Sequence, residues 1–154
     1  MKKINLFLVS LLAVITLSVN LSSCSKDDPV NNEIEGNIVG KWILIETTLN
    51  GEKQPVFDGE FLEIKSDGTF LEYDYAEELI SRQYSWDHAV GNWKQTNGKL
   101  ELNYDSEKTY ELYPNQGFIT YIPFAYTIDK LNDKTLVLSG SIAGYTGINT
   151  YQRQ

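Results

Sequence analysis

The chain has 154 residues, with 13 lysines and arginines, 21 aspartates and glutamates and a net charge of −8. This acidity disfavours nucleic-acid binding and adhesion to anionic lipid headgroups, because both rely on Lys and Arg. Since the chain has one cysteine, it cannot form an internal disulfide or a thiolate metal cluster.

Residues 1–23 have the pattern of a secretory signal. Two lysines precede an apolar run over residues 4–19, which is too short and too close to the N-terminus to indicate a membrane span. The run ends in Leu21-Ser22-Ser23-Cys24, which resembles the lipobox of bacterial lipoproteins. The resemblance implies cleavage between Ser23 and Cys24, a diacylglyceryl group on the Cys24 sulfur and acylation of the new amine. The alternative is a buried or free structural cysteine in an uncleaved helix.

Residues 24–37 are predicted to form a lipidated, flexible tether, because they are mainly polar and contain Pro and Gly. Ser25-Lys26-Asp27-Asp28 resembles the surface-export signal of lipoproteins in the Bacteroidetes group. This implies a lipid-anchored protein on the outer face of the outer membrane, and the alternative is an ordinary solvated linker. Loss of residues 1–23 removes two lysines and no acid, which brings the net charge to −10.

Residues 38–154 are predicted to form one all-β domain, because short strands alternate with turn signals. Asn50-Gly51, Ser66-Asp67-Gly68 and Thr96-Asn97-Gly98 are such turns, with glycine available for positive φ. The strands are predicted at 42–49, 61–65, 69–75, 93–95, 99–104, 109–113, 118–131, 135–139 and 145–153. Short connections favour an antiparallel up-and-down barrel of eight or nine strands, since closure removes exposed strand edges.

One segment interrupts the strand pattern near residues 76–88. Ala76, Ile80 and Tyr84 recur at a spacing of four residues, and Leu79 lies beside them. This spacing predicts a short helix or loop insertion, either as a lid over one barrel mouth or as a structural plug or peripheral crossover.

Several motifs occur in an order that points to a known family. They are Gly40-Lys41-Trp42, Asp67-Gly68-Thr69-Phe70, Gly91-Asn92-Trp93, a late hairpin over 126–138, and the closing Tyr151-Gln152-Arg153. Together they resemble the lipocalin-like domain found in many Bacteroidetes lipoproteins, over residues 37–154. The resemblance implies that Trp42 closes one barrel end and that Arg153 packs across it. The chain departs from classical lipocalins in its shorter length and its lack of a disulfide, so the size of the cavity stays open.

The sequence offers little catalytic chemistry. His88 follows Asp87, but adjacent residues on a strand point to opposite faces, and a solvated loop histidine is the alternative to a dyad. The paired carboxylates Glu60/Glu63 and Glu77-Glu78 would have to converge across a cleft to support hydrolysis. We therefore predict no catalytic residue, no metal and no cofactor, with a weak calcium site among the acids as an alternative.

The remaining candidates are aromatic. Tyr104, Tyr110 and Tyr126 fall in phase with apolar residues, and together with Phe124 they are predicted to line a ligand pocket. The alternative is core packing with the hydroxyl groups at a barrel rim. The predicted function is binding of a small, partly apolar ligand without catalysis.

Two other functions stay open. One is an interaction module with a filled barrel that binds an envelope protein or glycan through its loops, and the other is an isomerase- or hydrolase-like enzyme. A cavity of ~300 Å³ or more favours ligand binding over the module.

Overall fold

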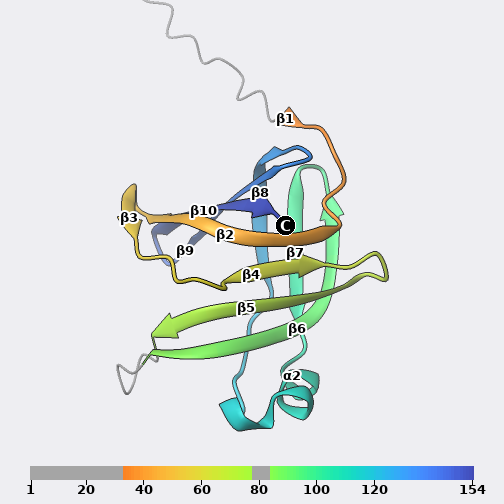
Figure 1. The fold of residues 1–154 in the computed structure, drawn as a ribbon, viewed down its shortest axis with the longest axis vertical. Coiled ribbons are helices and arrows are strands. Elements are labelled where there is room, and N and C mark those ends of the chain that lie inside the picture. The colour runs from red at the N-terminus through yellow and green to blue at the C-terminus, as the bar shows by residue number, and fades with distance from the viewer. Residues whose placement is uncertain (1–32, 78–83) are drawn as a thin grey trace, which may run out of the picture. The chain divides into compact units, whose positions relative to one another are not determined.

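The computed structural model describes residues 33–77 and 84–154, which belong to the compact unit Asn32–Gln154. Eight antiparallel strands form a closed barrel (Figure 1). They are β2 (Gly40–Leu49), β4 (Phe61–Ile64), β5 (Thr69–Glu77), β6 (Tyr84–Thr96), β7 (Lys99–Tyr104), β8 (Phe124–Leu131), β9 (Thr135–Ile142) and β10 (Tyr145–Arg153). Each strand pairs with the next along the chain, and β10 pairs with β2 to complete the circle. The predicted all-β, up-and-down barrel is confirmed.

Four short elements complete the described residues. Strand β1 (Glu33–Ile34) runs parallel to β8, and β3 (Glu52–Gln54) pairs with the end of β2. Helix α2 (Ser106–Leu112) and the 3₁₀ turn η1 (Pro114–Gln116) lie between β7 and β8. In Figure 1, α2 lies at the bottom beyond β6, whereas β1 lies at the top. No helix among the described residues is long and apolar enough to cross a membrane.

Strand β1 falls inside the segment that was predicted as a flexible tether. Its residues pair with Lys130 and Leu131, and the Glu35 amide donates to the Leu131 carbonyl at 2.7 Å. The side chain of Ile34 packs against the apolar core. Ordered structure therefore begins before residue 38, while residues 1–32, including Ser23 and Cys24, lie outside the described residues.

The Asn-Gly turns form as predicted and help to set the strand register. Asn50 and Gly51 have φ values of 52° and 82°, and Asn97 and Gly98 have φ values of 50° and 74°. Positive φ at both central residues matches the right-handed twist of a two-residue hairpin, and Asn and Gly adopt it most readily. These turns connect β2 to β3 and β6 to β7.

The short helix or loop insertion predicted near residues 76–88 is wrong at residues 76–77 and 84–88, the part of this segment that the structure describes. Strand β5 continues to Glu77 and β6 begins at Tyr84, so residues 76–77 and 84–88 are strand. The two strands pair residue by residue from Thr69–Asn92 to Glu77–Tyr84. This pairing satisfies the backbone groups and outweighs a weak four-residue apolar spacing. Residues 78–83 lie outside the described residues.

The strand predicted at 109–113 is also wrong, because α2 occupies this segment. The Asp105 side chain caps the helix by accepting a hydrogen bond from the Lys108 amide at 2.9 Å. An aspartate before the first helical residue, followed by an acid in the first turn, is a helix-start signal. Strand β8 is likewise shorter than the predicted strand at 118–131 and begins at Phe124.

The connection between β7 and β8 covers an exposed edge of β6. Strand β7 reaches only as far as the Gly91–Tyr104 pair, so β6 extends beyond it. The Gln116 amide donates to the His88 carbonyl at 2.8 Å and accepts from the His88 amide at 2.9 Å. The buried Thr109 hydroxyl accepts from the Val90 amide at 3.1 Å. Side chains of the connection thus take the place of a partner strand and complete this part of the wall.

Trp42 and Arg153 meet at the closed end of the barrel. Trp42 is fully buried, and its indole donates to the Ile38 carbonyl at 2.7 Å. The Arg153 guanidinium lies over the indole, with Cζ 4.2 Å from the ring centroid, and also donates to the carbonyls of Val39 and Asn37. The structure therefore brings together the two residues that the sequence predicted to close the barrel.

Gly40 makes this arrangement possible. Its φ is +151°, a conformation that favours glycine, and a Cβ there would lie 2.6 Å from Arg153 Nη1. The glycine of the Gly40-Lys41-Trp42 motif thus leaves room for the arginine that covers the tryptophan. Buried apolar side chains fill the adjoining half of the barrel, among them Leu62, Ile64, Phe70, Leu100, Leu102 and Leu138.

Candidate functional site

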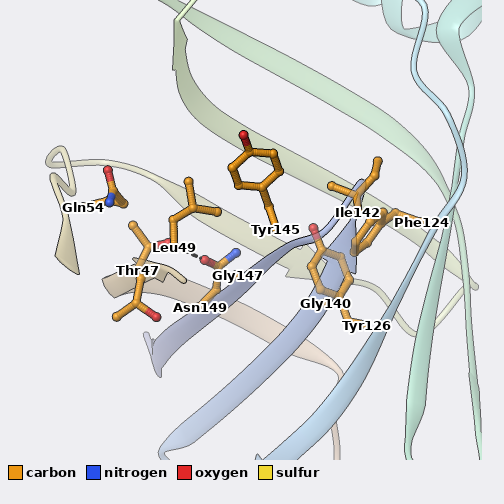
Figure 2. Close-up of a pocket in the computed structure, with 11 residues that line it drawn as sticks. Thr47, Leu49, Gln54, Phe124, Tyr126, Gly140, Ile142, Tyr145, Gly147 and Asn149 are labelled. Carbon is orange, nitrogen blue, oxygen red and sulfur yellow. Dashed lines mark hydrogen bonds between the residues drawn. The ribbon is translucent and has the colours of Figure 1, made fainter. Parts of the chain in front are cut away.

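The opposite end of the barrel holds an open cavity of about 310 Å³, which we call the mouth cavity. Its lining combines residues of β2, β3, β8, β9 and β10. Figure 2 shows Thr47, Leu49 and Gln54 on one side and Phe124, Tyr126 and Ile142 on the other, with Tyr145 between them. The lining is largely apolar, because Leu49, Phe124, Tyr126, Ile142 and Tyr145 contribute most of its large side chains.

Two glycines shape the mouth cavity. A Cβ at Gly140 would lie 2.5 Å from the Phe124 ring, so this glycine lets the ring lie against β9. A Cβ at Gly147 would meet only the Thr48 carbonyl oxygen, at 3.7 Å, which is an ordinary contact. The absence of a side chain at Gly147 therefore leaves space in the cavity rather than relieving a clash.

A few polar groups lie in the wall of the mouth cavity. The Thr47 hydroxyl donates to Asn149 Oδ1 at 2.6 Å, the bond drawn in Figure 2. Asn149 Nδ2 makes a long contact of 3.4 Å to the Tyr151 hydroxyl. Thr48 Oγ1 is buried without a hydrogen-bond partner. An apolar cavity with a few placed polar groups is typical of a small-molecule site.

A smaller polar cavity of about 80 Å³, the inner chamber, lies next to the mouth cavity. Tyr126 and Asn149 line both spaces. Three carboxyl residues, Glu60, Glu72 and Asp74, also line the chamber. Glu60 is buried at 4% exposure, Glu72 is partly buried, and Asp74 is the most exposed of the three.

Burial and like charge act together on these carboxyl groups. Desolvation, with a smaller contribution from the charge of Asp74, raises the pKa of Glu72 to about 7, although a hydrogen bond from Tyr104 opposes the shift. The same two causes raise the pKa of Glu60. Desolvation and the charge of Asp87 raise the pKa of Asp74, against the effect of the Tyr75 amide. Each of the three carboxyl groups therefore holds a proton more tightly than a free side chain does.

A family model for the lipocalin-like domain matches residues 38–138. The chain belongs to the lipocalin-like domain family. Among solved structures it is similar to a lipocalin-like protein from Bacteroides uniformis ATCC 8492, with 16% identity and a TM-score of 0.53. It is also similar to an uncharacterized protein from Bacteroides eggerthii DSM 20697, with 21% identity and a TM-score of 0.50. Each likeness covers 77% of this chain and 100% of the other.

These identities establish a shared fold and nothing about the ligand. No curated protein matches the chain. The function of this lipocalin-like domain must therefore be argued from its own side chains.

The four aromatic residues predicted to bind ligand lie in three different places. Phe124 and Tyr126 line the mouth cavity, with ring centroids 4.6 Å apart. Tyr104 lies outside the mouth cavity, donates to Glu72 Oε2 at 2.8 Å and stacks on Tyr121. Tyr110 is 44% exposed on α2, because the segment that was predicted as a strand is a helix.

His88 packs in an aromatic stack. Its ring lies parallel to Tyr113 at 4.0 Å between centroids and also contacts Tyr73 at 4.3 Å. Desolvation lowers its pKa, against opposing effects of Asp87 and Gln116. The residue lies in β6 rather than in a solvated loop, and its ring packs as a structural side chain.

The carboxyl groups of Glu60 and Glu63, which are close in sequence, do not face each other. Glu60 lines the inner chamber, whereas Glu63 lies on the other side of the sheet, with its carboxylate 3.9 Å from Lys65 Nζ. The Glu77-Glu78 pair extends beyond the described residues. Among residues 33–77 and 84–154, no group of three His, Cys, Asp or Glu residues is arranged to hold a metal ion.

The sequence did not single out several residues that line the two spaces. Ile142, Tyr145 and Asn149 come from the β9–β10 hairpin, whose position is set by the pairing of β10 with β2 and of β9 with β8. Glu72 and Asp74 could have been found by phase, because they follow the buried Phe70 by two and four residues along β5 and so face the same side of the sheet. An acid in phase with a core residue is an unusual inward-facing polar group and is a useful signal.

Proposed function

We propose that this lipocalin-like protein binds a small, partly apolar molecule in the mouth cavity. The observation that carries the proposal is the open, largely apolar cavity of about 310 Å³. This volume lies at the lower end of the range for small-molecule sites, roughly 300–1,000 Å³. We propose that binding occurs without catalysis, in keeping with a family of typically non-catalytic binding proteins.

A phenylalanine at position 147 should block the proposed site. Gly147 lines the mouth cavity, and its backbone accepts a side chain without a close contact. We expect Gly147→Phe to weaken binding of the neutral fluorescent probe N-phenyl-1-naphthylamine at least tenfold in a titration of the mature protein. Ile148→Phe is the matched control, because the neighbouring residue points to the opposite face of β10. Equal binding by wild type and Gly147→Phe would exclude the mouth cavity as the site.

We also propose that the protein is a lipoprotein, anchored in the outer membrane through Cys24 and exposed at the cell surface. The support is the residue pattern of 1–28. With two or more acyl chains, membrane attachment is stable, because each buried methylene contributes about 0.8 kcal/mol.

Cys24→Ser should abolish metabolic labelling with palmitate and release the protein from the membrane fraction. Because Cys24 is the only cysteine in the chain, no second thiol can accept the lipid. Ser25→Ala is the matched control and should be labelled like the wild type. Undiminished labelling of Cys24→Ser would refute the anchor. Proteinase digestion of intact cells tests surface exposure separately.

One observation favours the alternative function of an interaction module. The connection between β7 and β8 exposes apolar side chains by 44–62%, namely Tyr110, Leu112, Phe118 and Ile122. Recovery of empty protein with one specific partner from its own host would favour this alternative, whereas native mass spectrometry that finds a small molecule would favour the first proposal.

A further inference from the structure

We propose that the mouth cavity and the inner chamber form one site for an amphipathic amine. The apolar body of the ligand would occupy the mouth cavity, and its ammonium group would reach the carboxyl groups of the chamber. This inference rests on the proposed ligand-binding function and specifies the class of ligand.

The two spaces share part of their walls. Tyr126 and Asn149 line both, so a ligand in the mouth cavity lies next to the chamber. The change in chemistry at this boundary is sharp. Leu49, Phe124 and Ile142 line the mouth cavity, whereas Glu60 and Glu72 line the chamber. A molecule with an apolar body and a polar end matches both parts at once.

The charge of the chamber has one sign. Three of its nine lining residues carry carboxyl groups, and none of the nine is Lys, Arg or His. Within the part of the chain that the structure describes, the two salt bridges join Lys53 to Glu46 and Lys65 to Glu63, away from the chamber. The charge of Asp74 raises the pKa of both Glu60 and Glu72, so a cation among these groups would relieve electrostatic repulsion.

Tyr151 gives independent support for a ligand group in the chamber. This residue is only 5% exposed and lines the chamber. Among the described residues, its hydroxyl oxygen accepts one hydrogen bond, a long contact of 3.4 Å from Asn149 Nδ2. Buried polar groups normally have a good partner. An ammonium group would donate a stronger hydrogen bond to this oxygen.

The same charges argue against other ligand classes. A carboxylate-headed ligand, such as a fatty acid, would bring a fourth negative charge next to Glu72 and Asp74 in a poorly solvated space. A bare metal ion would need several converging ligands, and the described residues hold no such group. An ammonium group needs only hydrogen-bond acceptors and negative charge, which carboxylates and the Tyr151 oxygen supply.

The test compares three probes with the same alkyl chain, namely octylamine, octan-1-ol and octanoate. Each displaces N-phenyl-1-naphthylamine from the mature protein at pH 8, where Glu72 is mostly ionised. We expect octylamine to bind about tenfold more tightly than octan-1-ol, and octanoate to bind more weakly than either.

Two double variants separate the chamber from the surface. Glu72→Gln with Asp74→Asn should remove the preference for octylamine over octan-1-ol. Glu52→Gln with Glu111→Gln makes the same change in net charge at two exposed positions and should keep the preference. Retention of the preference in the chamber variant would overturn the proposal.

Wild-type protein alone provides a further test that does not depend on the folding of a variant. At pH 5.5 the preference for octylamine should fall severalfold, because the chamber gains protons while the amine keeps its charge. The groups that face Glu72 are the acid Asp74 and the tyrosines Tyr104, Tyr121, Tyr126 and Tyr151, and Glu60 lines the same chamber. Burial raises the pKa of each of these four tyrosines, so the tyrosines stay neutral at both pH values.

The outcomes distinguish this inference from the proposed function. If octan-1-ol binds and Gly147→Phe prevents its binding, but octylamine has no advantage, the amine proposal fails and the ligand-binding function stands. If the dye binds in the mouth cavity but none of the three probes displaces it, the amine proposal fails and the ligand-binding function stands. If the dye binds wild type and Gly147→Phe equally, the mouth cavity is excluded and both fail. Octanoate binding as tight as that of octylamine also overturns the amine proposal.

Discussion

Trp42→Ala should lower the free energy of unfolding by about 3–5 kcal/mol, the usual cost of removing a buried aromatic side chain. Trp42 is fully buried in the closed end of the barrel, so its removal leaves a cavity. The substitution also leaves the Ile38 carbonyl without its indole donor and the Arg153 guanidinium without its aromatic face. Urea denaturation of the mature protein, monitored by far-UV circular dichroism, measures the loss.

The same experiment on Arg153→Ala and on the double variant measures the coupling between the two residues. The Arg153 guanidinium packs on the face of the Trp42 indole and donates hydrogen bonds to the carbonyls of Val39 and Asn37. We expect a coupling free energy of about 1–2 kcal/mol, which combines the cation–π contact with shared packing.

Trp93→Ala is the matched control for this cycle. Trp93 is partly buried, and its indole donates to the Lys65 carbonyl rather than contacting Arg153. The losses of unfolding free energy caused by Trp93→Ala and Arg153→Ala should therefore be closer to additive than those caused by Trp42→Ala and Arg153→Ala. Strict additivity of Trp42→Ala and Arg153→Ala would contradict closure of the barrel by this pair.

The second large effect is on the pH dependence of stability. The pKa of Glu72 rises from 4.5 to about 7 on folding, chiefly through burial, so the folded state binds its proton more tightly than the unfolded chain. The resulting stabilisation is fully present below pH 4.5 and is lost as the pH rises through 7. Its size is on the order of 3 kcal/mol, from about 1.4 kcal/mol for each unit of pKa. The raised pKa values of Glu60 and Asp74 act in the same direction.

Glu72→Gln should remove most of this dependence. Glutamine keeps an oxygen that accepts the Tyr104 hydrogen bond but carries no charge. We therefore expect the variant to be more stable than the wild type at pH 8, by about 1–3 kcal/mol, and nearly equal to it at pH 4.5.

Urea denaturation at a series of pH values measures the difference between variant and wild type. The comparison cancels the opposing effect of His88, whose lowered pKa costs stability as the pH falls below 6.5. Glu111→Gln, an exposed substitution on α2, should leave the pH dependence unchanged. A difference that does not vary with pH would mean that Glu72 is ionised in the folded protein throughout this range.

Local sequence signals predicted the strands well, because turn chemistry acts over a few residues. The turn at Asn97-Gly98 depends only on positive φ angles at these two residues. The strand predicted after it, at 99–104, is the observed β7. Alternation also worked where one face is fully buried, as for Leu100 and Leu102. The failures lie in the connections. Asp105 caps a helix where a strand was predicted at 109–113. The apolar spacing that predicted a helix or loop near residues 76–88 did not prevent the pairing of β5 with β6.

The candidate site was less accessible to sequence reasoning. Phe124 and Tyr126 were predicted to bind ligand and line the mouth cavity. The same prediction for Tyr110 assumed a strand, but Tyr110 lies in helix α2 and does not face the cavity. Asn149 reaches the site through the pairing of β10 with β2, and its side chain accepts from Thr47, about a hundred residues away in the chain.

The sequence by itself determined the class of fold and the strand order, because hairpin turns and alternating side chains make each strand pair with its neighbour. The resemblance to the lipocalin-like domain, rather than any local pattern, pointed to Trp42 and Arg153 at the closed end, where the structure places them in contact. Only the tertiary structure decided that one half of the barrel is packed and the other holds a cavity with carboxyl groups. The volume and charge of an interior depend on side chains that meet across the barrel, and no local pattern fixes those distances.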